Sequence, residues 1–418
     1  MIKFYKNSST FTKNIITLMS GTTIAQAIPI AISPILTRIY TPEDFGLFAF
    51  YMSIISIVAV IVTGRFELAI MLPRKESDAL YIVIISSLLT LFISSFLFII
   101  IYFFNSSITI WLGNPNISKW LYFIPFSILL VGLYQSLNYW FNRKRDYKKL
   151  SMNRIIQSSS TSVTNLIFGF VKTFQGGLIL SSILGQFLAL IVFTKSIMTV
   201  ENRKFIKEIR IAKLIAIARK YKKFPQIDVP SALLNISSHQ SIAILFNIFF
   251  TPVVAGYFYL TQRILGLPVS IVATAVLDVF KEQAARDYRE YKNAKEIYKK
   301  TFKKLSILAT IPTLILYFIV VDIFVIVFGQ DWRIAGEYAQ LLLPMLFLQF
   351  ISSPLSFMFY IAEKQQYNLY TQLLLFILVL TSFYLKLEDV DTIIALSLSF
   401  SIFYCIQLVL SAKIAKVF

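Results

Sequence analysis

Cysteine and histidine are nearly absent from this chain of 418 residues, which contains one of each. Cys405 can therefore form no internal disulfide, and its place inside an apolar run indicates a packing residue. A conventional metal site is not expected with so few soft ligands. The chain also lacks a P-loop, which excludes a pump that carries its own ATPase motor. No catalytic signature is present, so we expect neither an enzyme nor a bound cofactor.

Acidic residues are few as well, because 21 Asp and Glu stand against 40 Lys and Arg, for a formal net charge of +19. In a soluble chain this balance would suggest a nucleic-acid partner. Here the cations mostly lie between apolar runs. We therefore expect them to contact anionic membrane lipids, and we expect no nucleic-acid partner.

Long apolar runs are the dominant feature of the sequence. Hydrophobic residues make up 57% of the chain and the mean hydropathy is +0.72, which excludes a soluble protein of this size. In lipid, only helices and closed barrels satisfy their backbone hydrogen bonds, and the runs are far longer than barrel strands of roughly 10 residues. The predicted fold class is therefore an all-α polytopic membrane protein. The polar, basic start and the long run behind it do not predict a cleavable signal peptide.

Twelve runs are long enough to cross a bilayer as helices, which takes about 20 residues. They lie at residues 14–37, 45–64, 79–104, 117–141, 151–171, 177–198, 226–250, 253–278, 305–328, 338–361, 367–385 and 392–412. Their connections are short, apart from basic segments at 199–225 and 279–304. The connections 38–44, 172–176 and 250–253 are too short to house a catalytic domain, which counts against a sugar polymerase or ligase.

The Lys and Arg residues predict the orientation. Most of them fall in one alternating set of segments, which includes both termini, whereas the opposite set holds only Arg38, Lys172, Arg333 and Lys386. Because cytoplasmic loops carry the excess of Lys and Arg, both termini are expected in the cytoplasm.

A short internal repeat precedes the second and the eighth span. Thr, Pro, Gly and Phe recur at one constant offset, as Thr41, Pro42, Gly46 and Phe48 and then as Thr251, Pro252, Gly256 and Phe258. Six spans in each half predict two parallel lobes related by a pseudo-two-fold axis along the membrane normal. The expected domains are residues 1–205 and 206–418. The alternative is a chance match of turn residues.

Arg263 lies near the middle of the predicted span 253–278. A charge at that depth costs several kcal/mol, and such residues usually face a bundle interior or a wet cavity. Helical spacing places Arg263, Gly266, Ser270 and Thr274 on one narrow arc. We interpret Arg263 as a cation that lines a pathway for something anionic. The alternative is an arginine that snorkels to the interface or binds a helix carbonyl.

Three other spans carry polar residues at helical spacing. The sets are Thr22, Gln26, Pro29, Ser33 and Thr37; then Asn153, Gln157, Ser160 and Thr164; then Asp228, Ser231, Asn235, Ser238 and His239. Together with Arg263 they favour a shared hydrated cavity. Bonding between helices is the alternative, since Ser, Thr, Asn and Gln often join membrane helices.

Further candidates lie at span ends. Arg65 and Glu67 either anchor the interface or mark the cytoplasmic mouth of the cavity. His239 could titrate near neutral pH, although a lone histidine is more often a packing residue. Asp228 lies near a span end, so no buried carboxylate relay for cation exchange is evident.

Several short motifs recur in order along the first half and the centre of the chain. They are Ser20-Gly21-Thr22-Thr23, Leu36-Thr37-Arg38-Ile39-Tyr40-Thr41-Pro42, Phe45-Gly46, Arg65-Phe66-Glu67-Leu68-Ala69-Ile70, Leu72-Pro73, the basic stretch from Asn142 to Ser151, Phe224-Pro225, Pro230, Leu233-Leu234-Asn235, Gly256-Tyr257-Phe258 and Arg263-Ile264-Leu265-Gly266-Leu267-Pro268. In their order and spacing these motifs resemble the Wzx-type polysaccharide flippases of the MOP exporter superfamily, whereas residues 300–418 resemble the family only in hydropathy.

The resemblance implies two six-helix lobes around a central cavity, in the plasma (inner) membrane of a bacterium. It further implies that undecaprenyl-pyrophosphate-linked oligosaccharide, as used for O-antigen, lipopolysaccharide or capsule, is flipped to the outer leaflet by alternating access. Arginine forks match phosphate oxygens, so Arg263 is the expected pyrophosphate ligand, with Arg38 and Arg65 nearer the two mouths. The expected sugar contacts are Gln26, Asn153, Gln157 and Asn235, and the expected bending positions are Gly46, Gly256, Pro252 and Pro268.

Other functions stay open at this point. A cation-coupled drug or small-molecule exporter of the same superfamily would want an acidic, aromatic-lined cavity, whereas the embedded charge here is positive. A scaffold that binds other polysaccharide assembly proteins is a further possibility.

Overall fold

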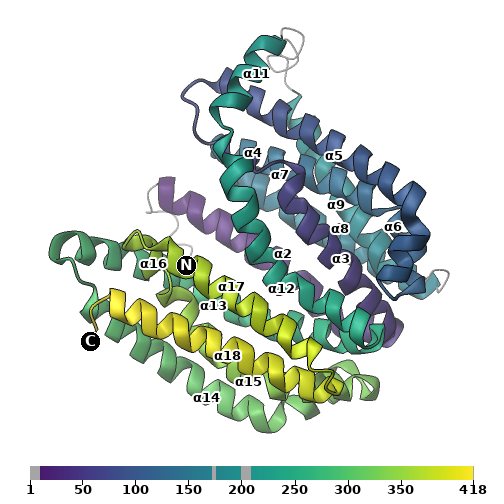
Figure 1. Ribbon diagram of the computed structural model, residues 1–418, viewed down its shortest axis with the longest axis vertical. Coiled ribbons are helices and arrows are strands. Elements are labelled where there is room, and N and C mark those ends of the chain that lie inside the picture. Colours follow the sequence, from purple (N-terminus) through teal and green to yellow (C-terminus); the bar gives the residue numbers. More distant parts are fainter. Residues whose placement is uncertain (1–9, 172–175, 199–208, 418) are drawn as a thin grey trace. The chain divides into compact units, whose positions relative to one another are not determined.

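Twelve long helices make up most of the part of the chain that the structure describes (Figure 1). The computed structural model describes residues 10–171, 176–198 and 209–417. In chain order the long helices are α2 (Thr10–Ile39), α3 (Pro42–Val62), α5 (Glu76–Trp111), α7 (Ile124–Arg143), α8 (Tyr147–Val171), α9 (Gly177–Ile197), α12 (Val229–Phe249), α13 (Pro252–Tyr291), α14 (Lys295–Phe328), α15 (Arg333–Leu355), α17 (Gln365–Tyr384) and α18 (Asp389–Ile414). This confirms the expected all-α fold.

The chain forms two compact units. The first comprises residues 1–40 and 47–236, and the second comprises residues 41–46 and 237–418. The first turn of α3 therefore belongs to the second unit, together with most of α12 and all of α13. The predicted boundary near residue 205 lies outside the described residues, as do Lys172 and the segment 1–9, so the division into 1–205 and 206–418 stays a prediction.

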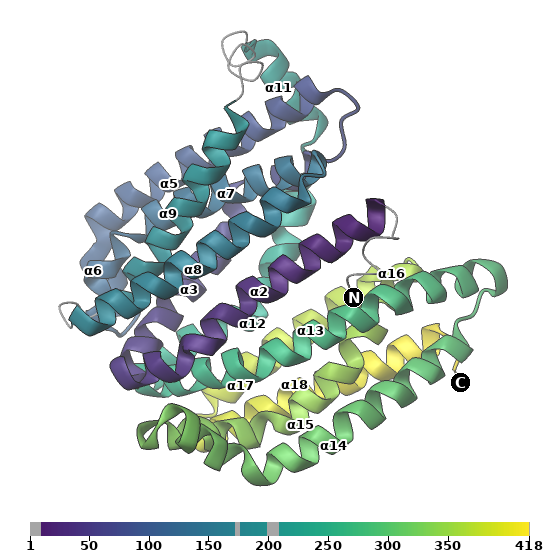
Figure 2. The same ribbon diagram turned by 180° about the vertical axis from the view of Figure 1, so that it is seen from behind.

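In the first unit, α8 is the central element, because it packs against α2 on one side and α9 on the other (Figure 2). The helices α5 and α7 pack against each other, and α7 also contacts α9. In the second unit, α15 packs against α13, α14 and α18. The apolar centre of that unit includes the fully buried side chains of Phe246, Tyr338 and Phe383.

Most long helices are suited to a membrane. Nine of the described helices are long and apolar enough to cross one, or eleven if each of two bent pairs is taken as one span. The long helix left out is α8, whose sequence is rich in Ser, Thr, Asn and Gln. Large apolar side chains elsewhere are exposed where lipid would cover them, among them Phe92, Phe96 and Phe103 of α5 and Ile311, Phe318 and Ile326 of α14.

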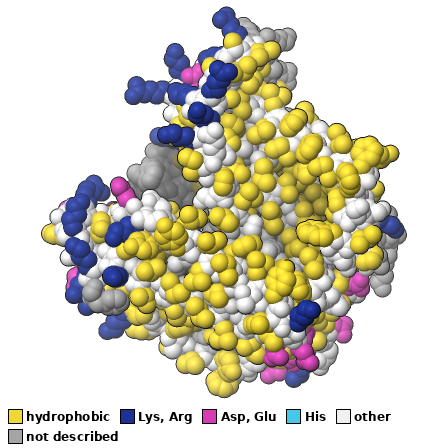
Figure 3. Space-filling model, in the orientation of Figure 1, with side chains coloured by type: hydrophobic (Ala, Val, Ile, Leu, Met, Phe, Trp, Pro, Cys, Tyr) yellow, Lys and Arg dark blue, Asp and Glu magenta, His cyan; other side chains and the backbone are white. Residues whose placement is uncertain are grey.

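Figure 3 shows the same division of surface chemistry. Apolar side chains cover most of the visible face, and Lys and Arg gather at its edges. In the second unit, the end of α13 and the start of α14 carry a group of basic residues, which includes the exposed Lys299, Lys300, Lys303 and Lys304. Basic edges beside an apolar belt are typical of helix ends at a lipid headgroup layer.

The helical path breaks between α3 and α5. Gly64 and Arg65 both adopt the left-handed conformation, with φ of 60° and 59°, and the short helix α4 (Phe66–Ala69) follows. Arg143 at the end of α7 holds this segment, because its Nη1 donates to the carbonyl of Ile70 at 3.0 Å and its Nη2 to that of Pro73 at 2.5 Å. The break turns the Glu67 side chain into the unit, where it is 2% exposed.

Candidate functional site

A cavity of about 220 Å³ lies among α3, α7, α8 and α9 of the first unit. It is smaller than the roughly 300–1,000 Å³ of pockets for drug-sized ligands, so it suits one small group. Its walls combine apolar side chains with neutral polar ones. The lining residues are Phe48, Met52, Ile55, Ser127, Leu130, Val131, Gln157, Thr161, Ser182, Ile183 and Gln186.

Two amides meet at this cavity. Nε2 of Gln157 on α8 donates to Oε1 of Gln186 on α9. The helices come close enough because α9 has glycine at position 185, where a Cβ would lie 1.9 Å from Oγ1 of Thr161. Each amide keeps further donor and acceptor positions for a ligand. The structure thus places Gln157, an expected sugar contact, beside a hollow that neutral hydroxyl groups fit.

A guanidinium lies about one helical turn from Gln157 along α8. Arg154 of α8 donates from Nη1 to Oγ1 of Thr22 on α2 at 2.6 Å, and the phenol of Tyr134 on α7 is within its electrostatic reach. Arg154 is half-buried. Sequence reasoning placed this arginine within a span but did not select it as a site residue. The available signal was the absence of Asp and Glu from the helices around it.

Other polar residues of α2 and α8 join helices. Asn153 is 1% exposed and donates from Nδ2 to the carbonyl of Ala189 on α9 at 2.8 Å. On the α2 side, Ser151 and Ser158 donate to the carbonyls of Thr17 and Ala25 at 3.1 Å and 2.5 Å. Gln26 on α2 is half-buried. The predicted stripe on α8 therefore has two roles, since Gln157 lines the cavity and Asn153 joins α8 to α9.

Arg263 is half-buried on α13, eleven residues after Pro252 begins the helix. A Cβ at Gly266, about one turn further on, would meet nothing within 4 Å. Ser270 and Thr274 on the same arc are exposed, and their hydroxyls donate to the carbonyls of Leu267 and Ser270 in their own helix. The arc is therefore not covered by other side chains at Gly266, Ser270 and Thr274. Pro268 lies inside the same helix.

The residues of the predicted stripe on α12 differ in exposure and in their neighbours. Asn235 and His239 are exposed, and the His239 ring lies 5.7 Å from that of Phe400. Ser238 is fully buried and donates to the carbonyl of Gln372 at 3.5 Å. Asp228 is half-buried at the end of the π-helix η2 (Phe224–Asp228), directly before α12.

Glu67 is buried in the break between α3 and α5. Its Oε2 accepts a hydrogen bond from Thr63 at 2.5 Å, and Arg65 Nη1 lies 3.6 Å from its Oε1. Burial raises the pKa of the Glu67 carboxyl, as does the negative charge of Asp228, while Thr63, the Glu67 backbone and Arg65 lower it in part. The carboxyl is therefore set to hold a proton more readily than a solvated glutamate does.

The remaining predicted residues lie at the ends of α2, α3 and α13. Arg38 is exposed in the last turn of α2, and its Nη1 donates to the carbonyl of Pro34 in the same helix at 2.9 Å. Gly46 and Gly256 each lie where the first turns of α3 and α13 cross. Both helices begin with Pro at their first position after Thr.

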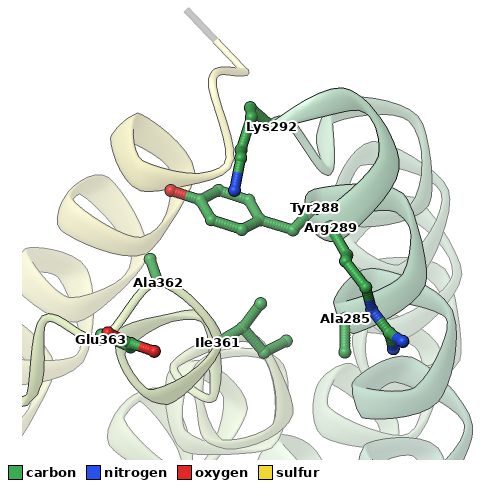
Figure 4. Close-up of a pocket in the computed structure, with 7 residues that line it drawn as sticks. All are labelled: Ala285, Tyr288, Arg289, Lys292, Ile361, Ala362 and Glu363. Carbon is green, nitrogen blue, oxygen red and sulfur yellow. The ribbon is translucent and has the colours of Figure 1, made fainter.

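A second cavity, of about 500 Å³, lies at the end of α13 (Figure 4). Tyr288, Arg289 and Lys292 come from the end of α13, with the Lys292 side chain directed toward the Tyr288 ring, and the turn at the end of α16 (Met358–Ile361) forms the opposite wall. Lys292 and Glu363 both have left-handed backbones, with φ of 53° and 56°. The lining residues are Ala285, Tyr288, Arg289, Lys292, Ile361, Ala362 and Glu363.

The chain matches the model of one protein family. The model of a family described as polysaccharide biosynthesis protein matches residues 35–336. The chain belongs to that family. The resemblance to polysaccharide flippases of the MOP superfamily is thereby confirmed at the level of family and fold. No curated protein matches this chain.

Solved structures share the fold along almost the whole chain. An inward-facing multidrug resistance MATE family transporter of the MOP superfamily has 12% identity and a TM-score of 0.70, with 96% of this chain and 95% of that one covered. A MOP superfamily transporter from Pyrococcus furiosus, described by the reverse polarity of its binding pocket, has 13% identity, coverage of 97% and 96%, and a TM-score of 0.64. The lipid II flippase MurJ, in an inward closed conformation, has 15% identity, coverage of 94% and 90%, and a TM-score of 0.63. The chain therefore shares its fold with these three proteins, and its apolar helices are those of a multi-pass membrane protein.

Proposed function

We propose that this polysaccharide biosynthesis protein is a flippase. It moves undecaprenyl-pyrophosphate-linked oligosaccharide repeat units from the cytoplasmic to the outer leaflet of a bacterial plasma membrane by alternating access, with both termini in the cytoplasm. The observation that carries the proposal is Arg263, a cation on a membrane-length helix beside the open space at Gly266. A pyrophosphate brings the matching negative charge, and arginine binds phosphate oxygens in a bidentate manner.

The cavity lined by Gln157 and Gln186 supports a sugar-bearing cargo. Amides and hydroxyls can donate to and accept from sugar hydroxyls without a charge, while the apolar walls formed by Met52 and Ile55 suit the face of a sugar ring. The lipid tail would stay in the bilayer. A drug exporter for cations would instead need carboxylates at this depth, and α2, α7, α8 and α9 contain none.

Flipping of a labelled polyprenyl-pyrophosphate oligosaccharide in proteoliposomes tests the proposal. Arg263→Ala is expected to abolish transport while the protein inserts at normal levels, and Arg263→Lys is expected to restore it in part, since lysine keeps the charge but not the fork. The matched control is Arg333→Gln, which removes an exposed cation paired with Glu337. Unchanged transport in Arg263→Ala would remove this assignment, and export of cationic drugs without flipping would favour the exporter.

A further inference from the structure

The cavity of about 500 Å³ at the end of α13 has no part in the proposed transport of the cargo. Three of its lining side chains are charged, namely Arg289, Lys292 and Glu363. Within the described part of the chain, none of these three side chains forms an ion pair or a hydrogen bond. A few polar groups that converge on a pocket of roughly 300–1,000 Å³ are typical of a ligand site. Two cations and one carboxylate are therefore available to a ligand here.

The charges come from two helix ends that face each other across the cavity. Lys292 directly follows the last residue of α13, and Glu363 follows α16 by two positions. Both have left-handed backbones, a conformation that glycine usually adopts at a helix end. Glycine would remove both charges from the cavity. Figure 4 shows the Lys292 side chain directed toward the Tyr288 ring, with Glu363 on the opposite wall.

The position of the cavity favours a lipid headgroup as the ligand. The turn that contains Glu363 joins two membrane-length helical segments, Gln330–Ile361 and Gln365–Tyr384, and irregular backbone of this kind lies outside the hydrocarbon layer. Tyr291 and Tyr360, next to lining residues on the two walls, are exposed, as is typical of tyrosine at the membrane interface.

The local charge favours an anionic headgroup. Residues 279–304, which supply one wall of the cavity, contain nine Lys or Arg and four Asp or Glu. The lining itself has one net positive charge, which a single phosphodiester would neutralise. A zwitterionic headgroup would leave this charge uncompensated. The remaining role is that of the Glu363 carboxylate, which repels a phosphate but accepts hydrogen bonds from hydroxyl groups.

We propose that this cavity binds the headgroup of an anionic glycerophospholipid that carries hydroxyl groups, with phosphatidylglycerol as the expected ligand. Arg289 and Lys292 bind the phosphodiester oxygens, and the Glu363 carboxylate accepts hydrogen bonds from the glycerol hydroxyls. The site lies entirely within the second unit. It contains none of the residues assigned to the cargo, so it stands or falls independently of the flippase function.

The experiment compares two phospholipids of equal charge. Phosphatidylglycerol and phosphatidylpropanol share the phosphodiester and the length of the headgroup, but phosphatidylpropanol lacks both hydroxyls. Each is added in increasing amounts to phosphatidylcholine nanodiscs that hold the purified full-length protein, and native mass spectrometry measures the bound lipid. The native protein is expected to bind phosphatidylglycerol about tenfold more tightly, the effect of one hydrogen bond to a charged group.

Three variants assign this preference to the cavity. Glu363→Gln should remove most of it without weakening the binding of phosphatidylpropanol, whereas Glu363→Asp, which keeps the carboxylate, should retain part of it. The double variant Arg289→Gln, Lys292→Gln should weaken both lipids alike, because these cations bind the shared phosphodiester. Thermal unfolding shows whether each variant is folded. A preference that survives in folded Glu363→Gln would overturn the proposal.

Further lipids test the chemical class of the ligand. Equal binding of phosphatidylglycerol and phosphatidylpropanol by the native protein would overturn the role of the hydroxyls, and tighter binding of phosphatidylethanolamine would overturn the anionic headgroup. Glycerophosphoglycerol, the headgroup without acyl chains, should compete only at far higher concentration than the intact lipid. Competition at equal concentration would identify a soluble phosphodiester as the ligand and overturn the lipid assignment.

Discussion

Gly46 and Gly256 each lie against the backbone of the other's helix. A Cβ at Gly46 would come within 1.7 Å of the carbonyl oxygen of Pro252, and one at Gly256 within 1.8 Å of that of Pro42. The glycine of each repeat thus contacts the proline of the other. This reciprocal contact gives the Thr-Pro-Gly-Phe repeat a physical reason, because only glycine lets the first turns of α3 and α13 cross this closely.

Alanine at either glycine should destabilise the crossing. Gly46→Ala and Gly256→Ala each place a methyl group against a backbone carbonyl that cannot move aside, and overpacking of this kind costs about 1–3 kcal/mol. Thermal unfolding in detergent measures the effect. Gly266→Ala is the control, because a Cβ there meets nothing within 4 Å and alanine favours a helix by about 0.5–1 kcal/mol. Unfolding temperatures of both alanine variants equal to that of the native protein would contradict the packing argument.

Glu67 should make stability depend on pH. Because burial raises the pKa of its carboxyl in the folded protein, the folded state holds this proton at pH values where the unfolded chain has lost it. The contribution to stability is therefore fully present below the ordinary glutamate pKa, about 4.3, and is lost as pH rises through the raised value. Glu67→Gln should flatten that part of the profile and stabilise the protein above it.

Unfolding midpoints across this pH range, compared between native protein and Glu67→Gln, provide the measurement. Glu76→Gln is the matched control, because that carboxylate is 53% exposed and pairs with Lys144 at the surface, where ion pairs contribute little. Parallel profiles for native protein and Glu67→Gln would show that the buried carboxyl does not titrate differently on folding.

Cysteine labelling should distinguish open faces from packed ones. In a Cys405→Ala background, Ser270→Cys and Asn235→Cys are expected to react quickly with a water-soluble thiol reagent, because both positions are exposed, and Gln26→Cys should react more slowly. Thr261→Cys is the buried control, since Thr261 is fully buried on α13 and donates to the carbonyl of Ala335. Inert cysteines at positions 235 and 270 would indicate that lipid rather than water covers these faces.

The cavity at the end of α13 should respond to anionic lipid. Arg289 and Lys292 line it beside a basic segment, and such clusters attract anionic headgroups by about 1 kcal/mol per basic residue. The double variant Arg289→Gln, Lys292→Gln should lose thermal stabilisation by phosphatidylglycerol over phosphatidylcholine. The double variant Lys299→Gln, Lys300→Gln carries the same charge change outside the cavity and should keep more of it. Equal losses would point to a diffuse surface effect.

Sequence periodicity predicted the twelve long helices but not their full lengths. The predicted span 253–278 continues in the structure as α13 to Tyr291. Residues 279–291 contain many charged side chains, so hydropathy ends the span at the membrane boundary, whereas Glu, Gln, Lys, Arg and Ala in this segment favour a helix in water as well. The Thr-Pro-Gly-Phe repeat, by contrast, could be recognised in the sequence, because Thr and Pro favour a helix start through local interactions.

The candidate site could be predicted only in part, for a related reason. Spacing places Asn153 and Gln157 on one stripe of α8, yet Asn153 faces α9 and Gln157 faces a cavity. Which neighbour each residue meets depends on helices far away in the chain. The partner of Arg154 is 132 residues distant, and no local pattern contains that information.

The length of α14 has a practical consequence. Its 34 residues extend about 51 Å at 1.5 Å per residue, whereas the hydrocarbon layer is about 30 Å thick. The beginning of the helix therefore extends beyond this layer, where Tyr298 packs against Ser411 of α18. Its exposed lysines, among them Lys299, Lys300, Lys303 and Lys304, can thus be reached by an amine-reactive reagent that does not enter the bilayer, which makes this end of α14 a marker for the side of the membrane that it faces.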